Sequence, residues 1–287
     1  NNGIYYWMYS QYDSALINYK KALEYSALTT EKRNKALVLG NIGLLYSNLF
    51  ITDSANKYLK ESIDYCQKYK INDILTKSRY DLGILYLNQG SYVKALMYFK
   101  PVEDSLKLNP NLKLNLLLHN VMGSMYHSVE DFDNSIRYLK MALDLNAENE
   151  ELNIMPDIDL NMAQCYLDLK KDYDSSHYYF RKMLETASEY NKDYVEINMN
   201  IGIGNTFTEQ RIHDSANIYY LKVVNDPKLD YFPSQQAAVY INLGKNYLEK
   251  DDYKKAEAFL LEGIAMAKNA DIVNYQSIGT HAMGRLK

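Results

Sequence analysis

The stretch DLGILYLNQGSYVKALMYFKPV, Asp81–Val102, contains the pattern that decides the fold. Gly83 is followed three residues later by Tyr86, and Ala95 is followed four residues later by Phe99. Spacings of three and four residues place side chains on one face of a helix. The polar break between the two patterns is typical of a tight turn. The stretch therefore predicts two antiparallel helices joined by a turn.

The same pattern recurs along the chain at a step of 40 residues. The small residue of the first helix is found at Gly3, Gly43, Gly83, Gly123, Ala163, Gly204, Gly244 and Gly284. The single step of 41 residues, between Ala163 and Gly204, reflects one inserted residue at Lys170–Lys171. A fixed period of this length is typical of a stacked array. We therefore expect an all-α protein in which residues 1–287 form a single array of antiparallel helix pairs, with a partial unit at Gly284.

Each repeated glycine lowers the stability of its helix, so a stabilising contact must compensate for it. Glycine in the middle of a helix costs about 1 kcal/mol relative to alanine. Small residues on both helices let their backbones approach closely, so we expect the glycines at the helix–helix contact, with large side chains beside them. An aspartate also recurs in the first turn of the second helix, where negative charge suits the helix dipole. Its members are Asp13, Asp53, Asp133, Asp174 and Asp214.

These features resemble the tetratricopeptide repeat (TPR) family. Its signature of Leu, Gly and Tyr on the first helix and Ala and Phe on the second is found in Asp81–Val102 and again in INLGKNYLEKDDYKKAEAFLLEGI, Ile241–Ile264. The usual family unit has about 34 residues, so units of 40 imply longer helices. The resemblance implies a right-handed α–α superhelix, the TPR solenoid. Because both ends of the chain cut through a unit, we expect a fragment of a longer protein.

The resemblance also implies a function and a site. TPR solenoids resembling this one bind a peptide or protein segment in the concave groove formed by their first helices, without catalysis. Matching the family pattern places groove residues at Asn41, Asp81, Asn120, His127, Asn161, Gln164, Asn205, Asn242 and Lys245. Asparagine offers two hydrogen-bond donors and an acceptor, so a ladder of asparagines can pair with the N–H and C=O groups of an extended peptide. The alternative is that these asparagines bridge neighbouring helices.

Composition argues against several other functions. The 32 Lys and Arg against 36 Asp and Glu give a net charge of −4, which argues against nucleic acid as a partner. No apolar run is long enough for a membrane span, and no signal peptide is evident, so cytoplasm and periplasm both stay open. The five histidines show no metal-ligand spacing, and no nucleophile has a base beside it. We therefore expect no cofactor, no metal and no catalytic residue.

A second interpretation belongs to a different class of function. The Lys-, Asn- and Tyr-rich composition and the long units resemble the sensor regions of bacterial signalling proteins. On this interpretation the array is the sensory or regulatory part of a signal-transduction or transcription regulator. A membrane helix, a DNA-binding module or a kinase module would then lie outside the present chain.

Overall fold

The computed structural model describes residues 12–28, 30–147, 154–189, 191–270 and 272–286, so Gly3 lies outside the described residues. These residues form helices and turns, with no strand among them. The chain divides into two compact units, residues 1–125 and 126–287, and each is described here by itself. That the two units form one continuous array stays a prediction.

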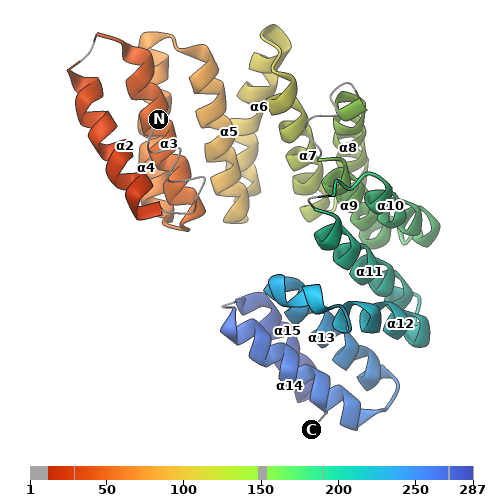
Figure 1. The fold of residues 1–287 in the computed structure, drawn as a ribbon. Coiled ribbons are helices and arrows are strands. Elements are labelled where there is room, and N and C mark those ends of the chain that lie inside the picture. Colours follow the sequence, from red (N-terminus) through yellow and green to blue (C-terminus); the bar gives the residue numbers. More distant parts are fainter. Residues whose placement is uncertain (1–11, 29, 148–153, 190, 271, 287) are drawn as a thin grey trace. The chain divides into compact units, whose positions relative to one another are not determined.

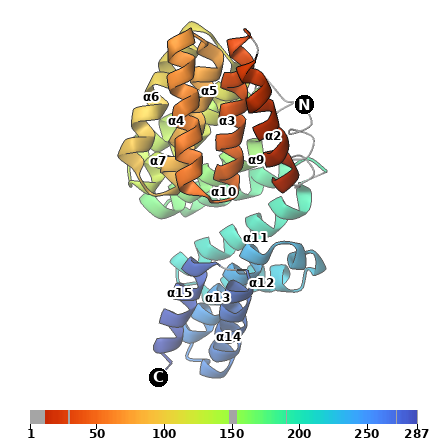
Figure 2. The same ribbon diagram turned by 90° about the vertical axis from the view of Figure 1, so that its left-hand side faces the viewer.

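Helices alternate between the two kinds expected from the repeat (Figure 1). The first helices of the repeats are α3 (Lys32–Asn48), α5 (Asn72–Asn88), α7 (Leu112–Ser128), α9 (Met155–Cys165), α11 (Lys192–Glu209), α13 (Pro233–Glu249) and α15 (Val273–Gly284). The second helices are α2 (Tyr12–Ala27), α4 (Thr52–Tyr69), α6 (Tyr92–Leu108), α8 (Phe132–Ala147), α10 (Tyr173–Glu185), α12 (His213–Val224) and α14 (Tyr253–Asn269). Within the first unit, helices α2 to α5 lie side by side (Figure 2). The all-α repeat prediction is confirmed.

The repeated glycines lie where the two helices of a pair touch. A Cβ atom added to Gly83 would stand 2.4 Å from the ring of Phe99, and one added to Gly204 would stand 2.4 Å from the ring of Tyr220. At Gly43 and Gly244 the same place is filled by a leucine, Leu59 and Leu260, at 2.6 Å. These distances are too short for any side chain, so the predicted close approach of the helices is confirmed.

A stacked pair of aromatic rings accompanies each of these contacts. The aromatic residue three positions after the small residue lies against a second ring on the partner helix, with ring centroids 5.5–5.7 Å apart and interplanar angles of 7–25°. The pairs are Tyr46–Tyr58, Tyr86–Tyr98, Tyr126–Tyr138, Tyr166–Tyr179, Phe207–Tyr219 and Tyr247–Phe259. Such pairs contribute about 0.5–1.5 kcal/mol beyond their buried area, so the tyrosine-rich composition serves the packing.

The turn between the helices has the same hydrogen bonds in successive repeats. In the repeat quoted first, the carbonyl of Tyr86 accepts a hydrogen bond from the N–H of Ser91 at 2.9 Å, and Gly90 takes the left-handed conformation with φ +67°. This pattern is the Schellman end of a helix. The equivalent left-handed residues of the other repeats are Phe50, Glu130, Lys171, Arg211 and Asp251, at φ between 55° and 61°. Glycine therefore occupies only one of these six positions.

The inserted residue of the fifth repeat lies in a π-helical turn. Residues Tyr166–Lys170 continue α9 as a π-helix, which holds one more residue in its hydrogen-bonded ring than an α-helix. The turn then closes as in the other repeats, because the N–H of Asp172 bonds to the carbonyl of Tyr166 at 3.1 Å. The extra residue thus leaves the aromatic stack and the turn intact.

Carboxylates stabilise the beginnings of several second helices. The five predicted aspartates lie in the first turns of α2, α4, α8, α10 and α12. The side chain of Asp172 also caps α10 by accepting from the N–H of Ser175 at 3.1 Å, and Asp252 caps α14 in the same way. Side-chain hydrogen bonds from the Ser175 hydroxyl and the Lys255 ammonium, followed by the backbone hydrogen bonds, lower the pKa of Asp172 and Asp252.

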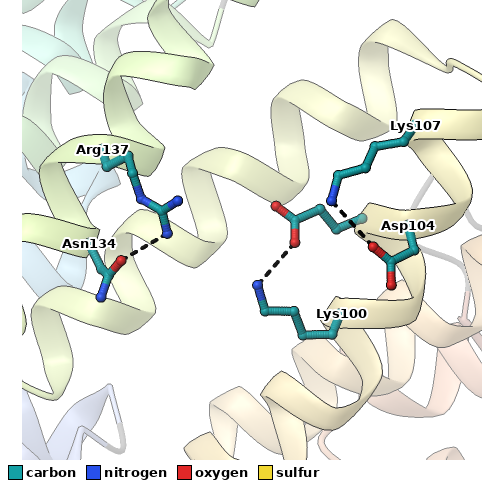
Figure 3. A network of polar contacts seen from close by, with 6 residues as sticks. Lys100, Asp104, Lys107, Asn134 and Arg137 are labelled. Atoms are coloured by element: carbon teal, nitrogen blue, oxygen red, sulfur yellow. Dashed lines mark hydrogen bonds and ion pairs between the residues drawn. The ribbon is translucent and has the colours of Figure 1, made fainter.

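Ion pairs on the helix surfaces, such as the exposed Lys107–Asp104 pair, contribute little. On α6, Lys100 pairs with Glu103 at 3.1 Å and Lys107 pairs with Asp104 at 3.3 Å (Figure 3). In the second unit, Arg137 donates to Asn134 at 2.8 Å on α8 (Figure 3). Exposed pairs of this kind are worth about 0–1 kcal/mol. Apolar packing therefore dominates the stability of both units.

Replacing Gly83 by alanine tests the glycine contact. The new methyl group would collide with the ring of Phe99, so Gly83→Ala should lower the free energy of unfolding by about 1–3 kcal/mol despite the better helix propensity of alanine. Urea unfolding followed by circular dichroism measures the change. Gly284→Ala is the matched control, because no described atom lies within 4 Å of its added Cβ, and it should not destabilise. Equal stability of both variants would contradict the close-contact interpretation.

Opposite substitutions at the left-handed turn position should have opposite effects. Phe50 is 89% exposed at φ 57°, so Phe50→Gly relieves backbone strain and should stabilise the chain by about 0.5–1 kcal/mol. Gly90→Ala places a side chain at φ +67° and should destabilise by about 1 kcal/mol. The midpoints of urea unfolding measure both. A change of the same sign in the two variants would show that the φ values do not govern stability here.

A buried acid should give the second unit a defined pH dependence. Asp159 of α9 is 0% exposed, with Lys182 Nζ 3.4 Å away, and burial raises its pKa to about 6, against about 3.9 in an unfolded chain. The folded state therefore holds this proton more tightly, and the resulting stability is full below pH 4 and is lost as the pH rises to about 6. The difference in unfolding free energy between Asp159→Asn and wild type should change by on the order of 2 kcal/mol over that window. A constant difference from pH 4 to pH 7 would show that Asp159 ionises normally.

Candidate functional site

A groove lined by the first helices opens in the second unit. It encloses a volume of about 220 Å³ between α9, α11, α13 and α15. Its apolar lining is Leu160, Leu167, Phe180, Ile201, Gly202, Ala238 and the ring of Tyr275, and its polar lining is Gln164, Asp168, Asn198, Asn205, Ser234 and Gln235. Amide side chains from three helices thus converge above an apolar floor.

Close packing of α11 against the preceding repeat positions this lining. A Cβ atom on Gly202 would stand 2.2 Å from the ring of Phe180 on α10, so only glycine allows this approach. The neighbouring residue Ile201 and, one turn later, Asn205 then border the groove. The glycine that brings α11 close therefore also places the groove side chains.

Two of the nine predicted groove residues line this cavity, Gln164 and Asn205. Asn242 of α13 lies beside them, because its Nδ2 donates to Asn205 Oδ1 at 2.9 Å. Asn161 is half-buried on α9, and Lys245 is exposed on α13. His127 bonds through Nε2 to the lining carboxylate of Asp168 at 3.0 Å. Of the six predicted residues beyond position 125, Gln164 and Asn205 line the cavity, while Asn242 and His127 are hydrogen-bonded to residues that line it. Asn161 lies on α9, and Lys245 is exposed to solvent.

The remaining three predicted residues belong to the first unit. Asn41 of α3 and Asn120 of α7 are half-buried. Asp81 of α5 is only 6% exposed and pairs with Lys77 one turn earlier. Burial raises the pKa of Asp81, and the Lys77 charge opposes that shift. Whether these three residues bind a ligand stays a prediction.

The lining residues that the sequence interpretation missed include Asn198, Gln235 and Tyr275. Asn198 lies six residues before Gly204, while Gln235 and Tyr275 lie nine residues before Gly244 and Gly284. The predicted set covered only the turns next to the small residue. Extending the repeat phase by two helical turns toward the N-terminus would have found all three.

The asparagine next to the groove centre is held by two donors. Asn205 Oδ1 accepts from the hydroxyl of Tyr220 at 2.7 Å and from Asn242 Nδ2 at 2.9 Å. Here the asparagine oxygen does bridge neighbouring helices, as the alternative interpretation required. Within the described residues its Nδ2 has no hydrogen-bond acceptor, so this amide is left for another molecule.

Asp168 gives the groove a negative edge. Its side chain is 50% exposed and is the one carboxylate among the lining residues, which include no Lys or Arg.

Within the described ranges, no group of His, Cys, Asp or Glu is arranged to hold a metal ion. Cys66 and Cys165 are free and buried, and burial raises the pKa of both thiols, which makes them poor nucleophiles. The chemistry on offer is hydrogen bonding, apolar contact and attraction of positive charge.

No helix among the described residues is long and apolar enough to cross a membrane.

Comparison with known proteins relates the chain to repeat proteins. A family model described as tetratricopeptide repeat matches residues 237–269. The anaphase-promoting complex subunit CDC16 of Saccharomyces cerevisiae is 21% identical over 168 residues, which are 56% of this chain and 19% of that protein. The match thus spans about a fifth of the length of that curated relative.

Solved structures share the fold at low sequence identity. The apo form of RapI has a TM-score of 0.75 and 13% identity, with 94% of this chain and 96% of that chain covered. A tetratricopeptide repeat protein from Parabacteroides merdae has a TM-score of 0.68 and 16% identity, with 98% and 96% covered. The apo form of the quorum sensor NprR from B. thuringiensis has a TM-score of 0.69 and 16% identity, with 96% and 78% covered. Taken with the repeat period and the matched family model, these neighbours show that the chain has the fold of tetratricopeptide repeat proteins.

Proposed function

We propose that the chain is a non-enzymatic scaffold whose second unit binds an extended peptide or protein segment in the groove of the first helices. The observation that carries this proposal is the convergence of amide side chains from α9, α11 and α13 over an apolar floor. Amides can satisfy both the N–H and the C=O groups of a backbone, and the floor can accept an apolar side chain.

The size of the groove favours a segment over a small metabolite. Sites that enclose a drug-sized molecule have volumes of about 300–1,000 Å³. A cavity of about 220 Å³ suits one or two side chains of a segment that continues beyond it along the first helices. The carboxylate of Asp168, with no cationic residue in the lining, favours a neutral or basic segment.

A second candidate function is a regulatory one. The fold is similar to that of the quorum sensor NprR, which supports a sensory region of a bacterial signalling or transcription regulator. In such a protein the groove would receive the signal, and a membrane helix, DNA-binding module or kinase module would lie outside residues 1–287. The reading frame that surrounds these residues tests this candidate, since it either encodes such a module or does not.

Selection of peptides against the chain tests the leading proposal. We expect a random octapeptide display library, selected on the 287-residue chain, to yield neutral or basic peptides that contain an apolar residue. A fluorescein-labelled copy of the tightest peptide then measures affinity by fluorescence anisotropy. Asn205→Ala and Gln164→Ala should each weaken this peptide by about 3- to 10-fold, because each removes about one hydrogen bond.

The matched control is an amide outside the groove. Gln67→Ala on α4 alters an exposed glutamine of a second helix in the first unit and should leave the affinity unchanged. Thermal unfolding of each variant checks that the fold is retained. Selection of no peptide, or of peptides indifferent to both groove variants, would overturn the proposal.

A further inference from the structure

The hydroxyl of Tyr220 does more than the packing requires. At the position that covers the repeat glycine, the repeats of Gly43, Gly83 and Gly244 use Leu59, Phe99 and Leu260, which carry no polar atom. The ring of Tyr220 covers Gly204 in the same manner and is only 1% exposed. An apolar side chain suffices at those three glycines, and the Tyr220 hydroxyl differs from the hydroxyl of Tyr19, which has no partner among the described residues, because it makes a hydrogen bond to another helix.

That hydroxyl reaches the groove through Asn205. Tyr220 has a single hydroxyl proton, which it donates to Asn205 Oδ1 at 2.7 Å. Thr208 Oγ1 lies 3.1 Å from the same hydroxyl, and the single proton of Thr208 also has Gly204 O and Asn246 Oδ1 as acceptors within reach. Burial raises the pKa of Tyr220, so the hydroxyl stays protonated and remains a donor.

This arrangement fixes which way the Asn205 amide points. Its Oδ1 faces two donors, the Tyr220 hydroxyl and Asn242 Nδ2. An amide turned by 180° about its terminal bond would set its NH2 group against Asn242 Nδ2 and lose that hydrogen bond, and the Tyr220 hydroxyl would have to accept from Asn205 instead of donating to it. The Nδ2 hydrogens of Asn205 therefore stay directed away from Tyr220, at a residue that lines the groove.

Asn242 supplies the complementary group. It uses one Nδ2 hydrogen on Asn205, and its Oδ1 accepts no hydrogen bond from the part of the chain that the structure describes. The two side chains are half-buried and 2.9 Å apart. A donor on Asn205 and an acceptor on Asn242 are thus available side by side.

We propose that Tyr220 is a positioning residue, whose hydroxyl sets the Asn205 amide so that Asn205 and Asn242 together bind the C=O and N–H of one residue in an extended segment. In an extended chain the two groups of one residue point to the same side, as they do when paired strands exchange two hydrogen bonds. The proposal rests on the proposed function, because it assumes that a segment lies in the groove. It adds that a buried side chain outside the groove determines where the groove presents a hydrogen-bond donor and where it presents an acceptor.

Tyr220→Phe tests the role of the hydroxyl, because it keeps the ring over Gly204. With the selected octapeptide described above as probe, we expect this variant to bind about 3- to 10-fold more weakly than wild type, with the thermal midpoint little changed. In the Asn205→Ala background the same substitution should cause no further loss, since the amide it positions is gone. This double-mutant cycle separates positioning from a general effect on structure.

The chain offers a matched control in Tyr19→Phe. Tyr19 occupies the same repeat position on α2, and its buried hydroxyl has no hydrogen-bond partner among the described residues. This variant should bind the probe like wild type. A loss equal to that of Tyr220→Phe would show that removing any buried hydroxyl weakens the fold, and would overturn the proposal.

Backbone ester substitutions in the probe test the acceptor. Each ester replaces one amide N–H by oxygen, so the ester at the residue that contacts Asn242 should bind more weakly. That penalty should disappear in Asn242→Ala.

Failure of this inference can be told apart from failure of the proposed function. If Asn205→Ala itself leaves the probe affinity unchanged, the groove is wrongly placed. If Asn205→Ala weakens binding while Tyr220→Phe does not, or if Tyr220→Phe weakens binding equally in the Asn205→Ala background, the groove stands and the positioning role is overturned. Ester penalties that are the same in Asn242→Ala and wild type would overturn the assignment of the acceptor.

Discussion

The contact between a glycine of one helix and a large side chain of the next is the constraint on which both units depend. Gly83 under Phe99 and Gly204 under Tyr220 bring the helix axes close enough for the neighbouring aromatic rings to stack. The turn follows from the same geometry. Two helices held this close need a short connection, which the left-handed residue and its Schellman hydrogen bonds provide. The helix pair and its turn therefore repeat together. The π-helical turn at Tyr166–Lys170 accommodates one extra residue and keeps both the aromatic stack and the closing turn.

This constraint also leaves one side of each first helix outside the glycine and aromatic contacts. The glycine, the aromatic residue and the buried aliphatic residues occupy the sides that face the partner helix and the neighbouring repeat. The remaining side in the second unit carries Gln164, Asn198, Asn205 and Gln235, which border a cavity instead of filling it. Side chains on this side can therefore vary without altering the glycine and aromatic contacts within each helix pair.

Spacing in the sequence predicted the parts of the molecule that depend on repetition. The helix pairs, the glycine contacts and the first-turn aspartates each recur at a fixed position of the 40-residue repeat, and each was expected from that recurrence. Features carried by dissimilar residues were missed. The left-handed turn position is occupied by Glu130, Arg211 and Asp251, whereas a glycine there would have predicted the left-handed conformation. Hydrogen bonds such as Asn242 to Asn205 join different repeats, and no spacing within one helix reveals whether an asparagine bonds to its neighbour or stays available.

A network of polar side chains lies behind the proposed groove residue Asn205. Behind Asn205, hydrogen bonds connect Tyr220, Thr208, Asn246 and His213, with donor–acceptor distances of 2.7–3.2 Å. Asn246 is 0% exposed, although an apolar residue would pack there without needing partners. A buried polar network is tolerable only when its members satisfy one another, and it holds side chains in fixed orientations. Such a network gives up apolar packing but fixes the orientation of its side chains. It lies behind Asn205, whose orientation would matter to a ligand in the groove. The departure from apolar packing at α11 to α13 therefore supports the proposed binding site, and its hydrogen bonds also join these helices.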